Sequence, residues 1–336
     1  MERYVLKELE KWKMSKYRKP LIVKGIRQVG KTWALMEFGK SYENTAYFNF
    51  DENEEYKQFF ETTKDPERIL QNLMMASGQP IKPHATLIIF DEIQACNEAL
   101  NALKYFCEKT PEYHIACAGS LLGITLSKPM SFPVGKVDFI NMFPMTFSEF
   151  LLANGDRKLV RFMDSINAIE QIPDAFFNPL CEKLKMYYVT GGMPESVRIW
   201  TEERDVGLLR RLSMLAPSAF AEGNRLFVEF KGALSENYVL QALVNRFEVM
   251  PRYWATDNPR YEVDFLIQRE NDIFPIEVKA EKNVESRSLK KYSEKFGNKS
   301  PLRIRFSMNN LRLDEDVLNI PLFLADYADK LIGMGK

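Results

Sequence analysis

The alternation of apolar and polar positions along the first 120 residues predicts strands that alternate with helices. Strands are expected at residues 21–24, 45–50, 86–90 and 113–118. Helices are expected at residues 1–19 (ended by Pro20), 32–40, 67–76 and 98–108. The third strand is apolar throughout, as a strand buried on both faces should be. This order is typical of a parallel α/β sheet with helices on both faces.

The pattern changes twice farther along the chain. Residues 147–200 show helical periodicity without a clear strand. Beyond about residue 227, helices are expected at 234–247 and 289–296, and strands at 261–268, 273–279 and 302–307. The sequence therefore predicts a first α/β domain over residues 1–150, a helical lid or linker over 151–225, and a smaller α/β domain over 226–336.

The overall charge excludes two classes of protein. Lys+Arg and Asp+Glu are 46 each, and 46% of residues are hydrophobic, so the chain is neither disordered nor a uniformly basic nucleic-acid wrapper. Although the total charges are equal, two stretches of the chain are basic. Residues 1–31 hold ten Lys/Arg against three Glu, and residues 277–305 hold nine against four. Each stretch is either a solvated surface or a phosphate-binding one.

Cysteine usage and hydropathy indicate a cytoplasmic protein. The four cysteines form no CxxC pair and there are two histidines, so we expect buried thiols in a reducing compartment and no zinc site. The apolar run at residues 115–126 is too short and too glycine-rich to span a membrane. The charged N-terminus lacks the apolar core of a secretory signal.

Residues 25–32 read G-I-R-Q-V-G-K-T, a G-x-x-x-x-G-K-T phosphate-binding loop between a predicted strand and a predicted helix. Glycines let backbone N–H groups turn toward phosphate oxygens, and the helix N-terminus adds its positive dipole end. Lys31 can then reach the β- and γ-phosphates, and the Thr32 hydroxyl can ligate Mg²⁺. The sequence predicts an ATP site formed by Gly25, Arg27, Gln28, Gly30, Lys31 and Thr32.

Polar residues at the ends of the third and fourth strands complete this site. Asp91 ends a buried strand, where it can hold Mg²⁺ through the water shell, and Glu92 is placed to polarise the attacking water. Ser120 ends the fourth strand. If that strand lies between the first and third, Ser120 can contact the water or the γ-phosphate. We predict Lys31, Asp91, Glu92 and Ser120 as the catalytic residues.

These segments, together with P-M-T-F-S-E-F (144–150) and G-G-M-P-E (191–195), resemble one prokaryotic family of AAA-type P-loop ATPases. The resemblance covers nearly the whole chain and implies a P-loop NTPase sheet, a helical lid and a C-terminal domain of uncharacterised function. G-G-M-P-E is favoured as a turn that ends a helix. No arginine lies between Arg68 and Arg157, so a transition-state arginine is not evident. The alternatives, some acting in trans in a homo-oligomer, are Lys128, Lys136, Arg157, Arg161 and Arg198.

The C-terminal domain carries a second constellation. Asp264 lies on the predicted strand that comes before the one carrying Glu277-Val278-Lys279. Glu277 and Lys279 share one face because side chains alternate along a strand. With Glu236 on the preceding helix, this order resembles the PD-(D/E)xK, or restriction-endonuclease-like, fold. The resemblance implies Mg²⁺ on Asp264 and Glu277, with Lys279 activating water and Glu236 assisting. The alternative is a degenerate copy that binds nucleic acid or is structural.

The junction near Asp205 is shorter than the resemblance leads us to expect. In the family a helical, winged-helix-like segment separates two stretches that adjoin here, which predicts an internal deletion or a compact variant. Three functions follow as hypotheses: an ATPase that drives or gates the C-terminal domain or a partner, an ATP-gated DNA nuclease, and a nucleotide-switched binding module.

Overall fold

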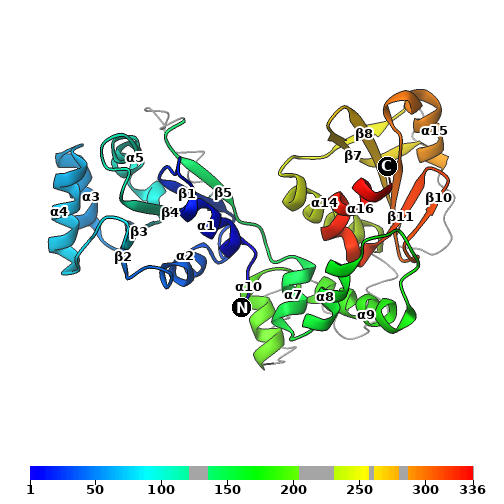
Figure 1. Cartoon of the computed structure of the whole chain (residues 1–336), viewed down its shortest axis with the longest axis horizontal. Coiled ribbons are helices and arrows are strands. Elements are labelled where there is room, and N and C mark those ends of the chain that lie inside the picture. The colour runs from blue at the N-terminus through cyan, green and yellow to red at the C-terminus, as the bar shows by residue number, and fades with distance from the viewer. Residues whose placement is uncertain (121–134, 204–230, 257–260, 280–286, 336) are drawn as a thin grey trace. The chain divides into compact units, whose positions relative to one another are not determined.

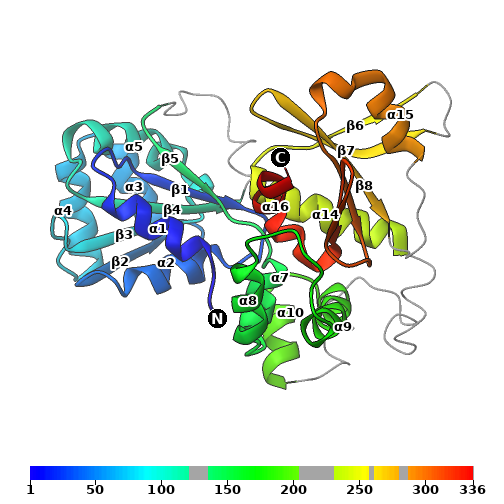
Figure 2. The same cartoon turned by 45° about the vertical axis from the view of Figure 1, so that its right-hand side comes forward.

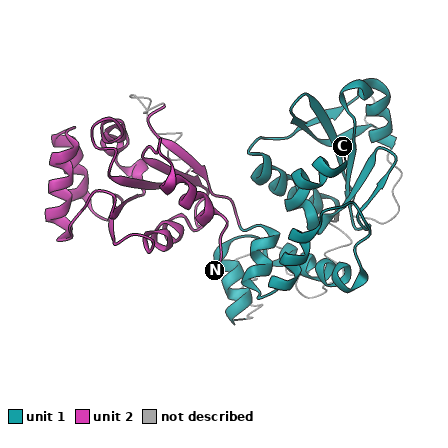
Figure 3. Cartoon of the chain, viewed as in Figure 1, with its two compact units in different colours: residues 1, 145–336 teal, residues 2–144 magenta. Residues whose placement is uncertain are grey.

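The computed structural model, shown in two views in Figure 1 and Figure 2, describes residues 1–120, 135–203, 231–256, 261–279 and 287–335. It contains two compact units (Figure 3). The N-terminal unit is residues 2–144, and the C-terminal unit is residue 1 with residues 145–336. Each is described by itself. The predicted boundary at residue 225 and the junction at Asp205 lie outside the described residues, so both stay predictions.

The N-terminal unit is built on a parallel sheet in the order β2-β3-β4-β1-β5. The strands are β1 (Leu21–Gly25), β2 (Asn44–Asn49), β3 (Thr86–Asp91), β4 (His114–Ser120) and β5 (Asp138–Asn141). β3 is buried along its whole length, which confirms the prediction from its continuous apolar run. β4 lies between β1 and β3, as the assignment of Ser120 requires.

Helices cover both faces of this sheet. They are α1 (Val5–Met14), α2 (Lys31–Gly39), α3 (Glu54–Thr62), α4 (Pro66–Ser77) and α5 (Asn97–Lys109). Because strand side chains alternate, Leu87 and Ile89 of β3 join a core with α1 and α2, whereas Ile88 and Phe90 join a core with α3, α4 and α5. The predicted helical layers on both faces are therefore confirmed.

The first helix is shorter than predicted. It ends at Met14, and Ser15 is already extended, so Pro20 does not end it. The last buried apolar residue of the helix is Trp12, whose indole N–H donates to the Lys19 carbonyl at 2.8 Å, while Tyr17 is exposed. The chain folds back after Trp12 because no apolar side chain beyond it would be buried by another helical turn.

The C-terminal unit contains a mixed sheet in the order β10-β11-β9-β8-β7-β6. The strands are β6 (Arg252–Ala255), β7 (Glu262–Arg269), β8 (Asp272–Lys279), β9 (Arg303–Ser307), β10 (Arg312–Asp314) and β11 (Val317–Pro321). β6, β7 and β8 are antiparallel neighbours, and β9 is parallel to both β8 and β11. This is the second α/β unit that the sequence predicts.

The helices of this unit pack on the sheet in two clusters. The helices are α7 (Phe147–Ala153), α8 (Arg157–Ser165), α9 (Asp174–Thr190), α10 (Pro194–Arg198), a π-helix (Ile199–Glu203), α14 (Lys231–Phe247), α15 (Arg287–Phe296) and α16 (Ala328–Gly335). α15, between β8 and β9 in sequence, packs with Val263 of β7, whereas α7, α8, α9, α10, α14 and α16 contribute to one large core. Phe150 and Leu184 belong to the same buried cluster as Leu243 and Ile276. The described part of the predicted lid or linker therefore packs on the C-terminal sheet.

The two motif segments that flank this helical region contact each other. α9 ends at Thr190, and its C-cap residue Gly191 has a φ of 73°, which confirms that G-G-M-P-E ends a helix. The Met145 N–H donates to the Gly192 carbonyl at 2.6 Å. Thr146 and Glu149 form a capping box at the start of α7. The two motifs are thus joined at the beginning of the C-terminal unit.

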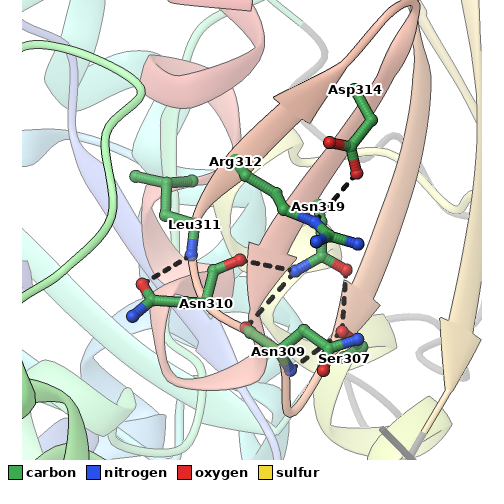
Figure 4. Close-up of polar contacts among 7 residues, drawn as sticks. All are labelled: Ser307, Asn309, Asn310, Leu311, Arg312, Asp314 and Asn319. Atoms are coloured by element: carbon green, nitrogen blue, oxygen red, sulfur yellow. Dashed lines mark hydrogen bonds and ion pairs between the residues drawn. The ribbon is translucent and has the colours of Figure 1, made fainter. Parts of the chain in front are cut away.

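A buried polar network holds the turn that follows β9 (Figure 4). Asn319 is fully buried; its amide donates to the carbonyls of Asn309 (3.3 Å) and Asn310 (2.9 Å), and its oxygen accepts from Ser307 at 2.7 Å. The Asn310 side chain in turn pairs with the backbone of Ile172 at 2.8 Å in both directions. These bonds are structural, because they satisfy buried groups and tie the segment before α9 to the sheet.

All four cysteines are free, with Cys96, Cys117 and Cys181 buried and Cys107 half-buried. Among the helices in the described ranges, none is long and apolar enough to cross a lipid bilayer.

Candidate functional site

The phosphate-binding loop connects β1 to α2. Gln28 (φ 62°) and Gly30 (φ 93°) adopt left-handed backbone conformations on either side of Val29. Such alternation turns successive N–H groups toward one concavity, which suits an anion. A Cβ on Gly25 would lie 2.4 Å from the Met142 carbonyl oxygen, so the loop begins where only glycine fits.

Lys31 is the first residue of α2 and is 8% exposed. Its ammonium group donates to the carbonyls of Gly25 (3.1 Å) and Ile26 (2.9 Å). Burial lowers the pKa of Lys31, and the nearby carboxylates Glu92 and Asp91 oppose that effect. The ammonium group therefore rests on neutral carbonyls that phosphate oxygens can replace.

Asp91 joins three elements at the carboxyl end of β3. It is 4% exposed, and its Oδ2 accepts hydrogen bonds from the Thr32 hydroxyl and the Tyr47 hydroxyl, each at 2.8 Å. Hydroxyl and carboxylate oxygens are the ligands that Mg²⁺ prefers. The predicted Thr32–Asp91 pair is thus in direct contact. Tyr47 is not among the residues predicted from the sequence, because its position on β2 opposite Ile89 depends on strand register.

Glu92 is held in an uncommon backbone conformation. Its φ of 49° is in the left-handed region, which is sparsely populated for residues other than glycine and tends to occur at functional sites. The Gln94 side-chain amide donates to the Glu92 carboxylate, while the Gln94 Oε1 atom is buried without a hydrogen-bond partner. Glu92 is therefore restrained by a neighbour two residues along the chain.

Ser120 and Arg27 complete the predicted set. Ser120 ends β4 and is in register with Gly25 of β1. Arg27 is exposed, and its charge contributes to the lowered pKa of Lys31. The structure brings the predicted nucleotide-site residues together at the carboxyl edge of the parallel sheet, where ligands bind in open α/β sheets.

The C-terminal constellation is also assembled on neighbouring elements. Asp264 and Glu277 lie on β7 and β8, next to the paired residues Phe265 and Ile276. The Asp264 Oδ2 atom accepts from the Val278 backbone N–H at 2.7 Å.

The charges of this second site compensate one another. Glu277 is 3% exposed and contacts the Lys279 ammonium at 3.2 Å. Burial raises the pKa of Asp264 to about 6; Glu236 and Glu277 add to the rise, and Lys279 and the Val278 N–H oppose it. Arg305 of β9 is in register with Glu277 and is 9% exposed. In the described part of the chain, no three His, Cys, Asp or Glu residues are grouped so as to hold a metal ion.

The candidates for a transition-state cation fall in different places. Lys136 pairs with Glu108 at 2.8 Å in the N-terminal unit. Arg198 pairs with Glu202 and Glu203 in the C-terminal unit, where Arg157 and Arg161 lie on α8. Lys128 lies outside the described residues. No one of them is singled out by its contacts.

Comparison with solved structures gives distant likenesses. A Walker-type ATPase of Pyrococcus abyssi is 16% identical, with 72% of this chain and 79% of that chain covered and a TM-score of 0.40. DnaA of Aquifex aeolicus bound to AMPPCP is 14% identical (73% and 68% covered, TM-score 0.36). The RuvB Holliday junction branch migration motor of Thermotoga maritima is 13% identical (75% and 79% covered, TM-score 0.34).

Comparison of the sequence itself is more specific. No curated protein sequence matches the chain. Residues 231–323 match the family model described as a domain of unknown function (DUF4143). Residues 17–151 match the family model described as an AAA domain. The parallel sheet and its phosphate-binding loop agree with this match, so the N-terminal part of the chain is similar to AAA domains.

Proposed function

We propose that this protein binds Mg·ATP at residues 25–32 and hydrolyses it, and that turnover acts on the C-terminal unit or on a partner. The observation that carries the proposal is the 2.8 Å contact between Thr32 and Asp91 at the start of α2. It places a hydroxyl and a buried carboxylate beside a loop whose N–H groups can bind phosphate.

Each residue has a distinct role in this proposal. The loop N–H groups and the N-terminus of α2 bind the phosphates, and the Lys31 ammonium moves from the loop carbonyls to the β- and γ-phosphates. Thr32 and Asp91 would hold Mg²⁺, which when bound neutralises charge on the phosphates. Glu92 orients and polarises the attacking water, and Ser120 contacts that water or the γ-phosphate.

A lysine exchange tests the proposal. We expect Lys31→Ala to abolish measurable ATP binding and turnover, because the loop loses its cation for the terminal phosphates. The matched control is Lys40→Ala at the end of the same helix, whose exposed ion pair with Glu37 lies outside the site. Turnover by Lys31→Ala equal to that of the wild type would refute the assignment.

A second candidate function is metal-dependent DNA cleavage by the C-terminal unit, gated by the ATPase. Glu236 on α14, Asp264 on β7, and Glu277 with Lys279 on β8 keep the helix–strand–strand order that the nuclease resemblance implies. The experiment is Mg²⁺-dependent nicking of plasmid DNA. Lys279→Ala should abolish it with ATP turnover intact, and Lys291→Ala, which removes an exposed charge on α15, should retain it. If the protein cleaves no form of DNA, that result counts against this function.

The coupling between the two activities is tested by measuring ATP turnover with and without DNA. Stimulation by DNA would connect the AAA domain to a nucleic-acid partner. ATP binding without turnover would instead favour a nucleotide-switched binding module, in which the bound nucleotide changes affinity for a partner.

A further inference from the structure

The peptide group between Val29 and Gly30 lies in the middle of the phosphate-binding loop. In a trans peptide the C=O and N–H bonds point in opposite directions, and the described chain has no cis peptide. Any group that holds the Val29 carbonyl therefore also aims the Gly30 N–H. Since Gln28 and Gly30 are both left-handed, this N–H belongs to the concavity that suits an anion.

Arg3 holds that carbonyl. Its Nη1 atom donates to the Val29 carbonyl at 3.1 Å, and its Nη2 atom donates to the Phe143 carbonyl at 2.8 Å. Arg3 is 5% exposed, so its charge is buried and depends on such hydrogen bonds. The guanidinium fork thus joins two backbone carbonyls that lie 114 residues apart in sequence, from Val29 to Phe143.

Phe143 belongs to a segment that is itself fixed against the start of the loop. The Met142 N–H donates to the Lys24 carbonyl at 2.6 Å. The Met142 carbonyl oxygen lies 2.4 Å from the position that a Cβ on Gly25 would take. Arg3 therefore connects the far side of the loop, at Val29, to the segment that packs against its near side, at Gly25.

We propose that Arg3 is a positioning residue of the ATP site, which fixes the loop conformation through the Val29 carbonyl and so pre-aims the Gly30 N–H at phosphate. A lysine cannot do the same, because an ammonium group is a point charge without a planar fork. The inference rests on the proposed ATP binding, and it adds a residue outside the G-x-x-x-x-G-K-T motif.

The test compares binding of a non-hydrolysable ATP analogue with Mg²⁺, by calorimetry, and the kcat and KM of ATP turnover. We expect Arg3→Ala to weaken binding about tenfold and to raise KM more than it lowers kcat. The matched control is Arg18→Ala, which removes another guanidinium that donates to two carbonyls of the same unit, Lys13 and Pro111, each at 3.2 Å. This control should bind within about twofold of the wild type.

A second measurement separates positioning from general destabilisation. A purely structural role would lower the unfolding temperature equally with and without the analogue, whereas a positioning role shrinks the rise that the analogue produces. Arg3→Lys should fall between the wild type and Arg3→Ala. Folded Arg3→Ala with wild-type affinity overturns the inference; if Arg3→Ala does not fold, Arg3→Lys with wild-type affinity overturns it. A wild-type protein that binds no analogue overturns the proposed function instead.

Discussion

The two candidate sites differ in what holds their carboxylates. The Asp91 Oδ2 atom accepts hydrogen bonds from two side-chain hydroxyls, those of Thr32 and Tyr47, while its Oδ1 atom accepts from the Glu92 backbone N–H at 3.0 Å. Asp264 instead accepts from the Val278 backbone N–H of the adjacent strand. A hydroxyl can rotate and turn its lone pairs to a cation, whereas a backbone N–H in a sheet is fixed and is a donor only. The Oδ2 atom of Asp91 is therefore held in a way that can adapt to a cation, whereas the Oδ2 atom of Asp264 is committed to the sheet.

The lysine ammonium groups of the two sites also differ in the groups that they contact. The Lys31 ammonium rests on the neutral carbonyls of Gly25 and Ile26. The Lys279 ammonium contacts the buried Glu277 carboxylate at 3.2 Å. A positive charge on neutral acceptors attracts an incoming anion, while an ion pair is already compensated. Sequence order predicts both sites, and the contacts of the two lysine side chains show that their charges are compensated differently.

The largest effect that would sharpen this contrast is on ATP turnover. We expect Glu92→Gln to lower kcat by about 100-fold or more, with nucleotide binding retained, because the amide cannot polarise water as the carboxylate does. Glu277→Gln should leave turnover unchanged. Glu98→Gln, an exposed residue of the following helix α5, is the control. A steady-state assay in which Glu92→Gln matches the wild type would remove the functional distinction between the sites.

The next effect is on stability and compares one glycine from each unit. Gly25→Ala should lower the free energy of unfolding by roughly 1–3 kcal/mol, since its Cβ would lie 2.4 Å from the Met142 carbonyl. Gly232→Ala in α14 should raise it by about 0.5–1 kcal/mol, since the nearest heavy atom to its Cβ is 3.8 Å away and alanine favours a helix.

Denaturant titration followed by tryptophan fluorescence measures both changes. Trp12 and Trp33 report the N-terminal unit, and Trp200 and Trp254 report the C-terminal unit. Equal and small effects at both glycines would show that the close approach at Gly25 does not constrain the phosphate-binding loop.

Local patterns were enough to predict the phosphate-binding loop and four of the five strands of the parallel sheet, all but β5. The continuous apolar run of β3 and the G-x-x-x-x-G-K-T spacing are each read from adjacent residues, so their elements are found within one or two residues of the prediction. α3 was missed because Phe60 is its one fully buried side chain, which leaves little helical periodicity. Its start is set by the Asn53 side chain, which accepts from the Glu55 N–H at 2.9 Å.

Contacts between distant residues could not be predicted in this way. Tyr47 reaches Asp91 across 44 positions, and Arg3 reaches Val29 and Phe143 across 26 and 140. Such contacts depend on the order and register of strands, which one sequence does not specify. The side chains that support the site were therefore missed although the side chains of the motif were found.

A smaller effect is expected from pH, and it has opposite signs in the two units. Burial lowers the pKa of His114 to about 4, with the charges of Arg18, His84 and Lys13 adding to the fall. The imidazole of the unfolded chain titrates near 6.5. The folded state favours the neutral form of His114, so the stability that depends on it is complete above about pH 6.5 and is lost as the pH falls toward 4.

In the C-terminal unit, burial raises the pKa of Asp326 to about 6; Glu149 adds to the rise, and the hydrogen bonds from Ser148 oppose it. Asp264 is shifted in the same direction. The folded unit then binds protons more tightly than the unfolded chain. The stability that these protonated carboxyl groups contribute is present below about pH 4 and is lost as the pH rises through 6.

As the pH rises from 4 to 6, the N-terminal unit should therefore gain stability while the C-terminal unit loses it. The thermal unfolding midpoints should shift by roughly 2–5 °C. Thermal unfolding followed by the tryptophans of each unit tests the signs. Asp326→Asn should flatten the profile of the C-terminal unit alone, and His114→Gln that of the N-terminal unit alone. Parallel profiles in the two units would contradict this assignment.

The smallest effect concerns the hydroxyl that the sequence did not reveal. Tyr47→Phe removes one of the two hydroxyls that donate to Asp91 and leaves the ring in place. Asp91 keeps its bond to Thr32, so we expect kcat to fall by roughly 2–10-fold with KM nearly unchanged. Tyr56→Phe, on α3, is the matched control. If Tyr47→Phe leaves kcat unchanged, the Thr32 hydroxyl is sufficient at the Asp91 Oδ2 atom, and the contrast with Asp264 then depends on a single hydroxyl.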